Sequence, residues 1–288
     1  MICVTGAGGT VGSELVRQLQ SAGIACRCTF FTRERAQSAR ERGLEAFLID
    51  YERPETLGDA LEGCERLFLL GPNVLNQCEL EQNVVEAAKA SGVQHIVKQS
   101  VLQADEMSYE LARVHRSVEQ AIESSGLAWT FLRPNSFMQN AVTFMSRTIR
   151  SDSAFFSASE QARISHVDVR DIAAVAVKAL TEPGHAGRAY ELTGPEALSY
   201  DDLASELSKV LGRTISHVSL PPPDLKAAML ADGVPEGLAD RLLDLEHYFR
   251  EEQASRVTED VLRITGRAPR SYADYVRATA ATGVWDAE

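Results

Sequence analysis

Short apolar runs alternate with amphipathic stretches over the first two thirds of the chain. The runs cover residues 1–5, 24–30, 45–50, 66–70, 95–100 and 128–134, and stretches with helical spacing cover 10–21, 33–42, 77–91 and 111–125. The runs have the length and near-continuous apolar character of strands that are buried on both faces. Strands that alternate with helices predict right-handed βαβ units. We therefore expect an α/β fold with a parallel sheet covered by helices on both faces.

The pattern changes after residue 134. It predicts helices over 138–150, 169–180 and 200–211 and strands over 163–167 and 189–194, and a Pro-rich segment at 220–224 then precedes three mostly helical segments. We expect a larger domain over 1–150 and a smaller one over 151–288, with some elements of the second part packing back on the sheet.

The charge and hydropathy of the chain argue against a nucleic acid or a membrane as its binding partner. The 288 residues carry a formal net charge of -12, and no cluster of lysine and arginine is present to bind the phosphates of a nucleic acid. No apolar run approaches the roughly 18 residues that a membrane-spanning helix needs, and Met1 leads directly into the first apolar run. We expect a cytoplasmic protein that binds a small molecule and has neither a nucleic acid nor a membrane as its partner.

The five cysteines are an odd number, and three of them fall inside apolar runs. This distribution is typical of free thiols in a reducing compartment rather than of disulfides. No Cys-x-x-Cys pair is present, so the usual spacing of zinc ligands is missing. We expect buried free thiols and no metal site.

The stretch VTGAGGTVG joins the first apolar run to the first helical stretch. Gly6, Gly9 and Gly12 recur there at every third residue. A strand that turns directly into a helix can place a diphosphate at the helix N-terminus, where free backbone N–H groups and the positive end of the helix dipole meet the anion. Glycine allows the tight turn, the close approach to the diphosphate and the packing of helix on strand. The candidate binding residues are Gly6, Gly8, Gly9, Thr10, Val11 and Gly12; a glycine-rich turn without a ligand is the alternative.

Five segments together resemble the NmrA-like family of atypical short-chain dehydrogenases/reductases. They are VTGAGGTVG, NVVEAAKASGVQHIVKQS, SGLAWTFLRPNSFMQN, RISHVDVRDIAAVAVKAL and TGRAPRSYADYV, and they reach from residue 1 to about residue 276. The resemblance implies a Rossmann-type, doubly wound parallel sheet that binds NAD(P) and a smaller α+β substrate domain at the carboxyl end. Members of the family include quinone, azo-dye and triphenylmethane reductases, and also redox-sensing regulators with no known turnover.

The residues after the second apolar run favour NADP (NADPH) over NAD. NAD-binding proteins usually place Asp or Glu at the tip of the second strand to bind the ribose hydroxyls, and no acid stands at that tip in CTFFTRER. Arg33 and Arg35 are close enough in sequence to pair with a 2′-phosphate; the alternative is that both are solvated residues at a helix start. Phe31 stands where the family commonly has an arginine, and its ring could stack on adenine.

Further cofactor-binding candidates lie at the carboxyl ends of the later strands, where ligands of open parallel sheets collect. Asp50 is expected near the adenine, or else as a helix cap ahead of Pro54. Pro72 and Asn73 end the fourth run, where backbone passes the ribose and diphosphate, or else they form a plain turn. Ser100 closes the fifth run, where it can bond to substrate or cofactor or cap the next helix.

The Tyr-x-x-x-Lys pair of short-chain dehydrogenases is missing at the aligned positions. In that pair the Lys lowers the pKa of the Tyr so that the phenol can donate a proton. In SYELARVHRSVEQAIE, Leu111 and His115 stand at the two positions, whereas Tyr109 and Arg113 keep the spacing out of phase. His115 borders the apolar helix face, so it is either a packed core residue or one that orients the substrate. Hydride transfer to a quinone or dye needs no protein acid, because the reduced product can take its proton from water.

The segment RPNSFMQN follows the sixth apolar run, where the family's substrate loop begins. Asn135, Phe137, Met138 and Asn140 combine apolar walls with amides, as small-molecule pockets do; packing between domains is the alternative for each. His166, in ISHVDV, is a second candidate proton donor. The catalytic candidates are therefore His115, Asn135 and His166.

Taken together, these features favour an NAD(P)H-dependent oxidoreductase. Such an enzyme would transfer hydride from the nicotinamide to a planar, conjugated acceptor, quinone-like or dye-like, between the glycine-rich edge and the second domain. Two alternatives stay open. One is a regulator that binds NADP(H) without turnover, and the other is an isomerase or cyclase that uses the same fold without redox chemistry. The oligomeric state stays open as well.

Overall fold

The computed structural model describes residues 1–286, which form two compact units. The first unit comprises residues 1–107, 112–133 and 169–191, and the second comprises 108–111, 134–168 and the described residues from 192 onward. The expected domains, 1–150 and 151–288, differ from these units in three places. Residues 108–111 and 134–150 belong to the second unit, and residues 169–191 return to the first.

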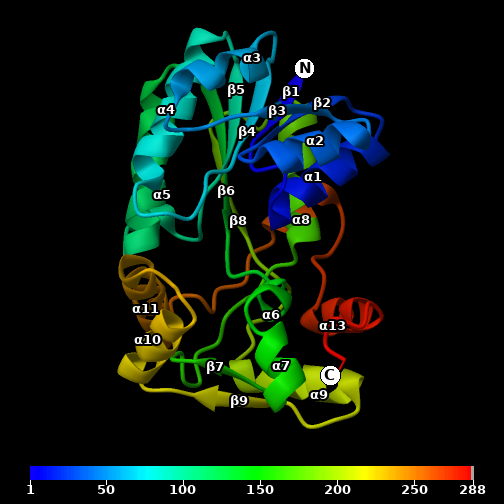
Figure 1. The fold of residues 1–288 in the computed structure, drawn as a ribbon, viewed down its shortest axis with the longest axis vertical. Coiled ribbons are helices and arrows are strands. Elements are labelled where there is room, and N and C mark those ends of the chain that lie inside the picture. The colour runs from blue at the N-terminus through cyan, green and yellow to red at the C-terminus, as the bar shows by residue number, and fades with distance from the viewer. Residues whose placement is uncertain (287–288) are drawn as a thin grey trace. The chain divides into compact units, whose positions relative to one another are not determined.

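A seven-stranded sheet in the order β3-β2-β1-β4-β5-β6-β8 forms the centre of the first unit (Figure 1). Its strands are β1 (Ile2–Val4), β2 (Cys26–Phe30), β3 (Glu45–Leu48), β4 (Arg66–Leu69), β5 (His95–Gln99), β6 (Ala128–Pro134) and β8 (Arg188–Leu192). Neighbouring strands from β3 to β6 pair in parallel, and Cys3 of β1 lies opposite both Arg27 and Leu67. The strand order reverses at β1, which creates the edge at which such sheets bind ligands. The predicted α/β fold of Rossmann type is confirmed.

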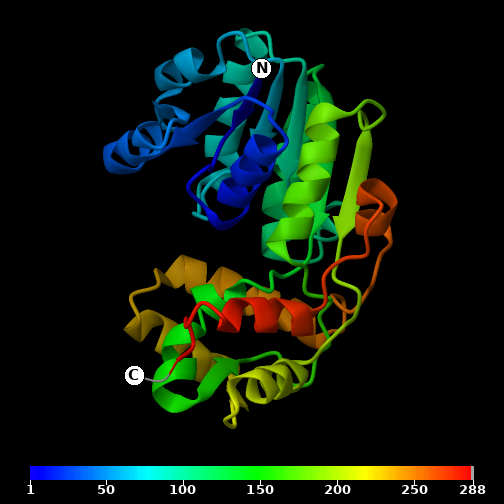
Figure 2. The ribbon, with the colours of Figure 1, turned by 90° about the vertical axis from the view of Figure 1, so that its right-hand side faces the viewer.

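Helices cover both faces of this sheet. They are α1 (Thr10–Ser21), α2 (Arg33–Glu41), α3 (Gly58–Leu61), α4 (Gln77–Ala90), α5 (Glu110–Ser124) and α8 (Val169–Thr181), with short 3₁₀ turns η1 (Pro54–Thr56) and η2 (Ala104–Glu106). On one face α1 and α8 pack side by side, and α4 and α5 lie on the other (Figures 1 and 2). Because α8 packs against α1 and β8 extends the sheet, residues 169–191 belong to the first unit.

Apolar residues of the strands and of α4 form a buried core on one face of the sheet. Leu67 and Ile96 of the strands lie in one cluster with Leu80, Val84 and Ala88 of α4. These three α4 positions follow the helical spacing, so a single stripe of the helix faces the sheet. Complete burial of a Leu, Ile or Val side chain stabilises the fold by about 1.5–3 kcal/mol.

The five cysteines are free thiols, and all but Cys78 are buried. Cys26 and Cys28 lie on one face of β2, with their Sγ atoms 4.0 Å apart. The expectation of free, largely buried thiols is confirmed. Within residues 1–286, no group of three or more His, Cys, Asp or Glu side chains is arranged to hold a metal ion.

The second unit combines a small sheet with seven helices among its described residues. Its strands β7 (Ala154–Ser157) and β9 (Ser216–Ser219) pair in parallel, and its helices are α6 (Asn140–Thr143), α7 (Ser146–Asp152), α9 (Tyr200–Leu211), α10 (Pro222–Ala231), α11 (Glu236–Arg250), α12 (Asp260–Thr265) and α13 (Tyr272–Ala280). Ser199 and Asp202 form a capping box that starts α9. Across the described part of the chain, no helix has both the length and the apolar character needed to cross a membrane.

Two elements predicted for this unit are wrong. The helix expected over 138–150 is divided into α6 and α7, because Phe144 and Met145 have φ of -116° and -109°, far from helical values. The strand expected over 163–167 is only a pair of isolated bridges. Its backbone N–H groups bond to separate segments, Ile164 to Leu198 and Ser165 to Ala254, so no continuous ladder forms.

Candidate functional site

The chain turns from β1 into α1 through a tight glycine-rich loop. Gly6 has a φ of +63°, which favours glycine, and its carbonyl oxygen accepts the Gly9 N–H at 2.9 Å. A Cβ on Gly12 would lie 2.1 Å from the same oxygen, so only glycine lets α1 approach the turn this closely. No side chain caps the N-terminus of α1. The first N–H groups of the helix, including those of Thr10 and Val11, are therefore suited to bind an anion.

A hollow of about 220 Å³ opens beside this turn. It is lined by Gly6, Gly8, Gly9, Thr29, Phe30, Phe31, Thr32, Arg35, Leu70, Gly71 and Pro72. These residues come from the glycine turn, from the end of β2 and from the segment after β4. The three segments meet at the carboxyl edge of the sheet, where the strand order reverses. Of the predicted cofactor-binding residues, the lining includes Gly6, Gly8, Gly9, Phe31 and Pro72.

The other predicted cofactor-binding residues lie outside this lining: Thr10, Val11, Gly12, Arg33, Asp50, Asn73 and Ser100. The Asp50 carboxylate accepts the backbone N–H of Glu52 at 3.0 Å and so stabilises its own turn. It is not the cap ahead of Pro54 that the alternative expected, because Arg53 is the N-cap residue of η1 and no side chain caps that turn. Ser100 is buried, and its hydroxyl has no hydrogen-bond partner within the described residues. Ser100 therefore retains an unused donor at the end of β5.

Two further residues of the hollow, Thr29 and Arg35, carry polar groups that can contact a ligand. Thr29 of β2 is buried, and its hydroxyl finds no partner in the part of the chain that the structure describes. The Arg35 side chain reaches back over the turn, with Nη1 3.4 Å from the position that a Cβ on Gly8 would take. Both arginines were considered for the 2′-phosphate, and the structure brings Arg35 rather than Arg33 into the lining. The hydroxyl could have been noticed, because Thr29 stands at the carboxyl end of a buried strand.

Phe31 forms an aromatic wall of the hollow. Its side chain is 45% exposed, and its ring packs edge-on against Tyr51 with centroids 4.9 Å apart. The Tyr51 hydroxyl donates to the Leu70 carbonyl at 3.0 Å, which links this wall to the segment after β4. An exposed phenyl ring at the rim of a hollow is suited to stack on a flat ring such as adenine.

His115 is buried in the first unit, and both of its ring nitrogens face protein groups. Nδ1 lies 3.2 Å from Nζ of Lys98, and Nε2 lies 3.4 Å from Nε2 of Gln77. Lys98 in turn forms an ion pair with Glu81 at 2.7 Å, and neither side chain is exposed. The sequence interpretation missed this ion pair. The contacts place His115 within a buried polar network at the end of β5.

Tyr109 and Arg113, the pair with four-residue spacing, take separate roles. Tyr109 is buried and packs on Tyr248 with ring centroids 4.2 Å apart, and burial raises the pKa of its phenol. Arg113 donates to the backbone carbonyl of Met107. The raised pKa disfavours the phenolate, so this arrangement does not activate the phenol.

Asn135 is buried in the second unit, where it ties loops together. Its amide nitrogen donates to Oγ of Ser165 and to the carbonyl oxygen of Ala254, both at 2.8 Å. Its amide oxygen accepts the backbone N–H of Ser136 at 2.8 Å. These bonds use both ends of the amide to hold the segment that leads to His166.

The predicted substrate-loop residues Phe137, Met138 and Asn140 do come together with His166. They line one small pocket of the second unit, which comprises Phe137, Met138, Asn140, Ala141, Met145, His166, Tyr200, Leu203 and Tyr272. Neither ring nitrogen of His166 has a hydrogen-bond partner among the described residues, and the same holds for the Tyr272 hydroxyl. Burial lowers the pKa of His166 to about 4. His166 is therefore neutral near pH 7 and offers one donor and one acceptor, but not an imidazolium acid.

Acidification is expected to destabilise the fold through His166. The imidazole titrates near its ordinary pKa of 6.5 when unfolded but only at about 4 when folded. Between these values the unfolded state binds more protons, so the free energy of unfolding falls by up to about 1.4 kcal/mol per pH unit. Urea unfolding at pH 7 and pH 5 measures this loss, and H166F should show a smaller one. An equal loss in both proteins would mean that His166 is not buried in its neutral form.

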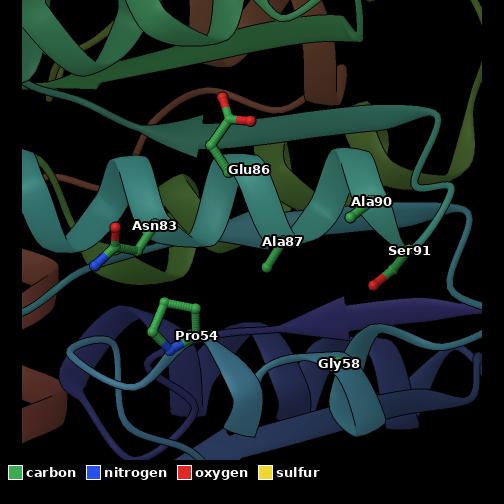
Figure 3. Close-up of a pocket in the computed structure, with 7 residues that line it drawn as sticks. All are labelled: Pro54, Gly58, Asn83, Glu86, Ala87, Ala90 and Ser91. Carbon is green, nitrogen blue, oxygen red and sulfur yellow. The ribbon is translucent and has the colours of Figure 1, made fainter.

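A second hollow in the first unit, of about 330 Å³, lies between the η1–α3 segment and the later turns of α4 (Figure 3). Pro54 and Gly58 form one side, and Asn83, Ala87 and Ser91 lie on the other. Glu86, its one charged residue, points away from Pro54 and Gly58 in Figure 3. The lining has no glycine-rich turn that leads from a strand into a helix, and its one α-helix start belongs to α3, which is only four residues long.

Comparison with known proteins assigns the chain to a family. The model of the NmrA-like family matches residues 1–271. The chain belongs to this family. An NAD(P)H azoreductase of Xenophilus azovorans is 36% identical, covering 98% of each chain.

Solved structures of family relatives share the fold. The NADPH complex of a quinone oxidoreductase from Escherichia coli superposes with a TM-score of 0.87 at 29% identity and covers 97% of this chain and 100% of its own. A triphenylmethane reductase from Citrobacter sp., bound to NADP(H), gives 0.84 at 26% identity and covers 96% and 99%. Both are full-length matches, so the likeness extends over both units.

The hollow beside Gly6 fits the dinucleotide that these family members hold. A diphosphate can approach the turn closely because the lining residues Gly6, Gly8 and Gly9 carry no side chains. The orphaned Thr29 hydroxyl and the free α1 N-terminus supply donors without protein acceptors. An anionic ligand with sugar hydroxyls satisfies both groups.

Proposed function

We propose that this chain is an NADPH-dependent oxidoreductase that transfers hydride to a conjugated small-molecule acceptor, quinone-like or dye-like. The observation that carries the proposal is the hollow in which a glycine turn, an uncapped helix N-terminus and the buried Thr29 hydroxyl meet. A dinucleotide needs these groups for its diphosphate and ribose. The azoreductase and quinone oxidoreductase relatives support this class of acceptor.

Arg35 and Phe31 support NADPH rather than NADH. Arg35 lines the hollow, and no carboxylate stands among the lining residues to bind a free 2′-hydroxyl. A guanidinium pairs well with a 2′-phosphate, whereas an acid would repel it. Phe31 provides the flat apolar wall for the adenine.

The residues of the chain bind and orient, and the dinucleotide supplies the hydride when it is bound. Gly6, Gly9 and the start of α1 would hold the diphosphate. Asn135 would hold the segment that carries His166 through its bonds to Ser165 and Ala254. The pKa of about 4 keeps His166 from acting as an imidazolium acid near pH 7. The reduced acceptor would then take its proton from water.

Two titrations test the proposal. NADPH and NADH are added to the protein while nicotinamide fluorescence is followed, and quinone and azo-dye panels are then tested for consumption of NADPH by absorbance. Binding of NADPH together with turnover of at least one acceptor is expected. Binding without any turnover would favour a regulator, and the absence of binding would remove the dinucleotide proposal itself.

Replacing Arg35 with alanine is expected to weaken NADPH binding about tenfold and to leave NADH binding nearly unchanged. One lost charge-assisted contact to the 2′-phosphate accounts for a change of this size. Arg33→Ala is the matched control, because Arg33 is an exposed arginine of the same helix outside the hollow. Equal effects of the two substitutions on NADPH would show that Arg35 makes no specific contact.

A further inference from the structure

Glu81 and Lys98 form a completely buried ion pair in the first unit. Lys98 Nζ lies 2.7 Å from Oε2 of Glu81, and both side chains have 0% exposure. Lys98 also donates to the Gln99 carbonyl and lies 3.2 Å from Nδ1 of His115. Burying such an ion pair costs free energy, and replacing both of its residues with apolar ones often leaves the stability of a protein unchanged. Its presence therefore calls for a role other than stability.

The other carboxylate oxygen of Glu81, Oε1, contacts a residue that lines the hollow beside Gly6. Oε1 accepts the backbone N–H of Gly71 at 3.0 Å and an N–H of Gln77 at 3.1 Å. Gly71 is itself part of the lining of the hollow. A Cβ on Gly71 would lie 2.5 Å from this same oxygen, so the carboxylate approaches the backbone as closely as glycine allows.

We infer that Glu81 is a positioning residue, whose carboxylate fixes Gly71 in the wall of the hollow beside Gly6 (the dinucleotide hollow). Lys98 supplies the counter-charge that keeps this carboxylate stable in a buried place. The inference rests on the proposed function. A charged acceptor binds a backbone N–H about twice as strongly as a neutral one does. Glu81 lies on the stripe of α4 that faces the sheet, in phase with Val84 and Ala88. The bond to Gly71 thus fixes the segment after β4 to a rigid helix.

Two double variants separate this role from simple stability. K98M/E81Q removes both charges and keeps a side-chain oxygen for the Gly71 N–H. K98M/E81L removes both charges and the acceptor as well. Neither variant leaves an unpaired buried charge, so melting temperatures within a few degrees of each other are expected. NADPH affinity, measured by nicotinamide fluorescence, should stay within about threefold of the wild type for K98M/E81Q and fall about tenfold for K98M/E81L.

Hydrogen exchange of the Gly71 amide gives a readout that needs no ligand. The amide should exchange slowly in the wild type and in K98M/E81Q, and faster in K98M/E81L. Equal NADPH affinity and equal Gly71 exchange in the two double variants would overturn the inference. Failure of the wild type to bind NADPH is a different result: it would remove the proposed function, whereas the Gly71 exchange would still report whether Glu81 holds this wall.

Discussion

Replacing Lys98 alone with methionine is expected to lower the free energy of unfolding by about 3–5 kcal/mol. The substitution keeps the length and apolar stem of the side chain, but it leaves the Glu81 carboxylate without its counter-charge at 0% exposure. A buried, unpaired carboxylate is destabilising because water no longer solvates it. Urea unfolding at pH 7, followed by circular dichroism, measures the loss. The loss should be visible as a lower denaturation midpoint with an unchanged slope.

Two further variants show whether this loss comes from the unpaired charge. Adding Glu81→Gln to Lys98→Met should recover most of the stability, since the double variant has no buried charge. Arg17→Met removes the exposed partner of the ion pair with Glu14 at the surface of α1, and it should change stability by less than about 1 kcal/mol. If Lys98→Met were no more destabilising than Arg17→Met, the two charges would not be buried as the structure places them.

The parallel sheet could be predicted because its strands are nearly continuous apolar runs. A strand buried on both faces leaves a simple sequence pattern, and each run in the first unit except the third is separated from the next by a helical stretch. Burial of β5 (His95–Gln99) along its whole length agrees with that pattern. The local sequence pattern was sufficient to predict this sheet, because each strand pairs with strands that are equally recognisable as apolar runs.

The second unit was harder to predict because its contacts join distant segments. Ser165 bonds to Ala254, and Val167 pairs with Phe137, so residues 163–167, which are expected to form a strand, have no continuous strand partner. No local pattern distinguishes a segment of isolated bridges from a ladder. The same holds for Asn135, whose amide was expected in a pocket and bonds instead to Ser165 and Ala254.

The spacing of residues along the sequence contained evidence for the Glu81–Lys98 ion pair. Gln77 and Glu81 fall in phase with Val84 and Ala88 on the buried stripe of α4. Lys98 stands in the middle of a strand that is buried throughout. Opposite charges inside two elements that are otherwise buried indicate a paired site. The sequence alone could not show that these elements pack together, nor that the carboxylate reaches Gly71.

Replacing Gly12 with alanine is expected to weaken NADPH binding at least 100-fold. The new Cβ would lie 2.1 Å from the Gly6 carbonyl oxygen and 2.7 Å from its carbon, so the turn or α1 must move. Movement of either one displaces the helix N–H groups from the place where a diphosphate would bind, and positioning errors of about 1 Å are known to cost on the order of 100-fold in function. Isothermal calorimetry with NADPH measures the affinity.

Gly58→Ala is the control for this substitution. Gly58 begins α3, and a Cβ there meets no atom within 4 Å, so alanine should leave NADPH affinity unchanged. Circular dichroism must show that Gly12→Ala remains folded, because the clash with Gly6 also destabilises the packing of α1 on β1. A folded Gly12→Ala protein that binds NADPH as tightly as the wild type would contradict the assignment of the β1–α1 turn as the diphosphate site. If binding is lost while the fold is kept, the close approach of α1 to Gly6 is what the dinucleotide requires.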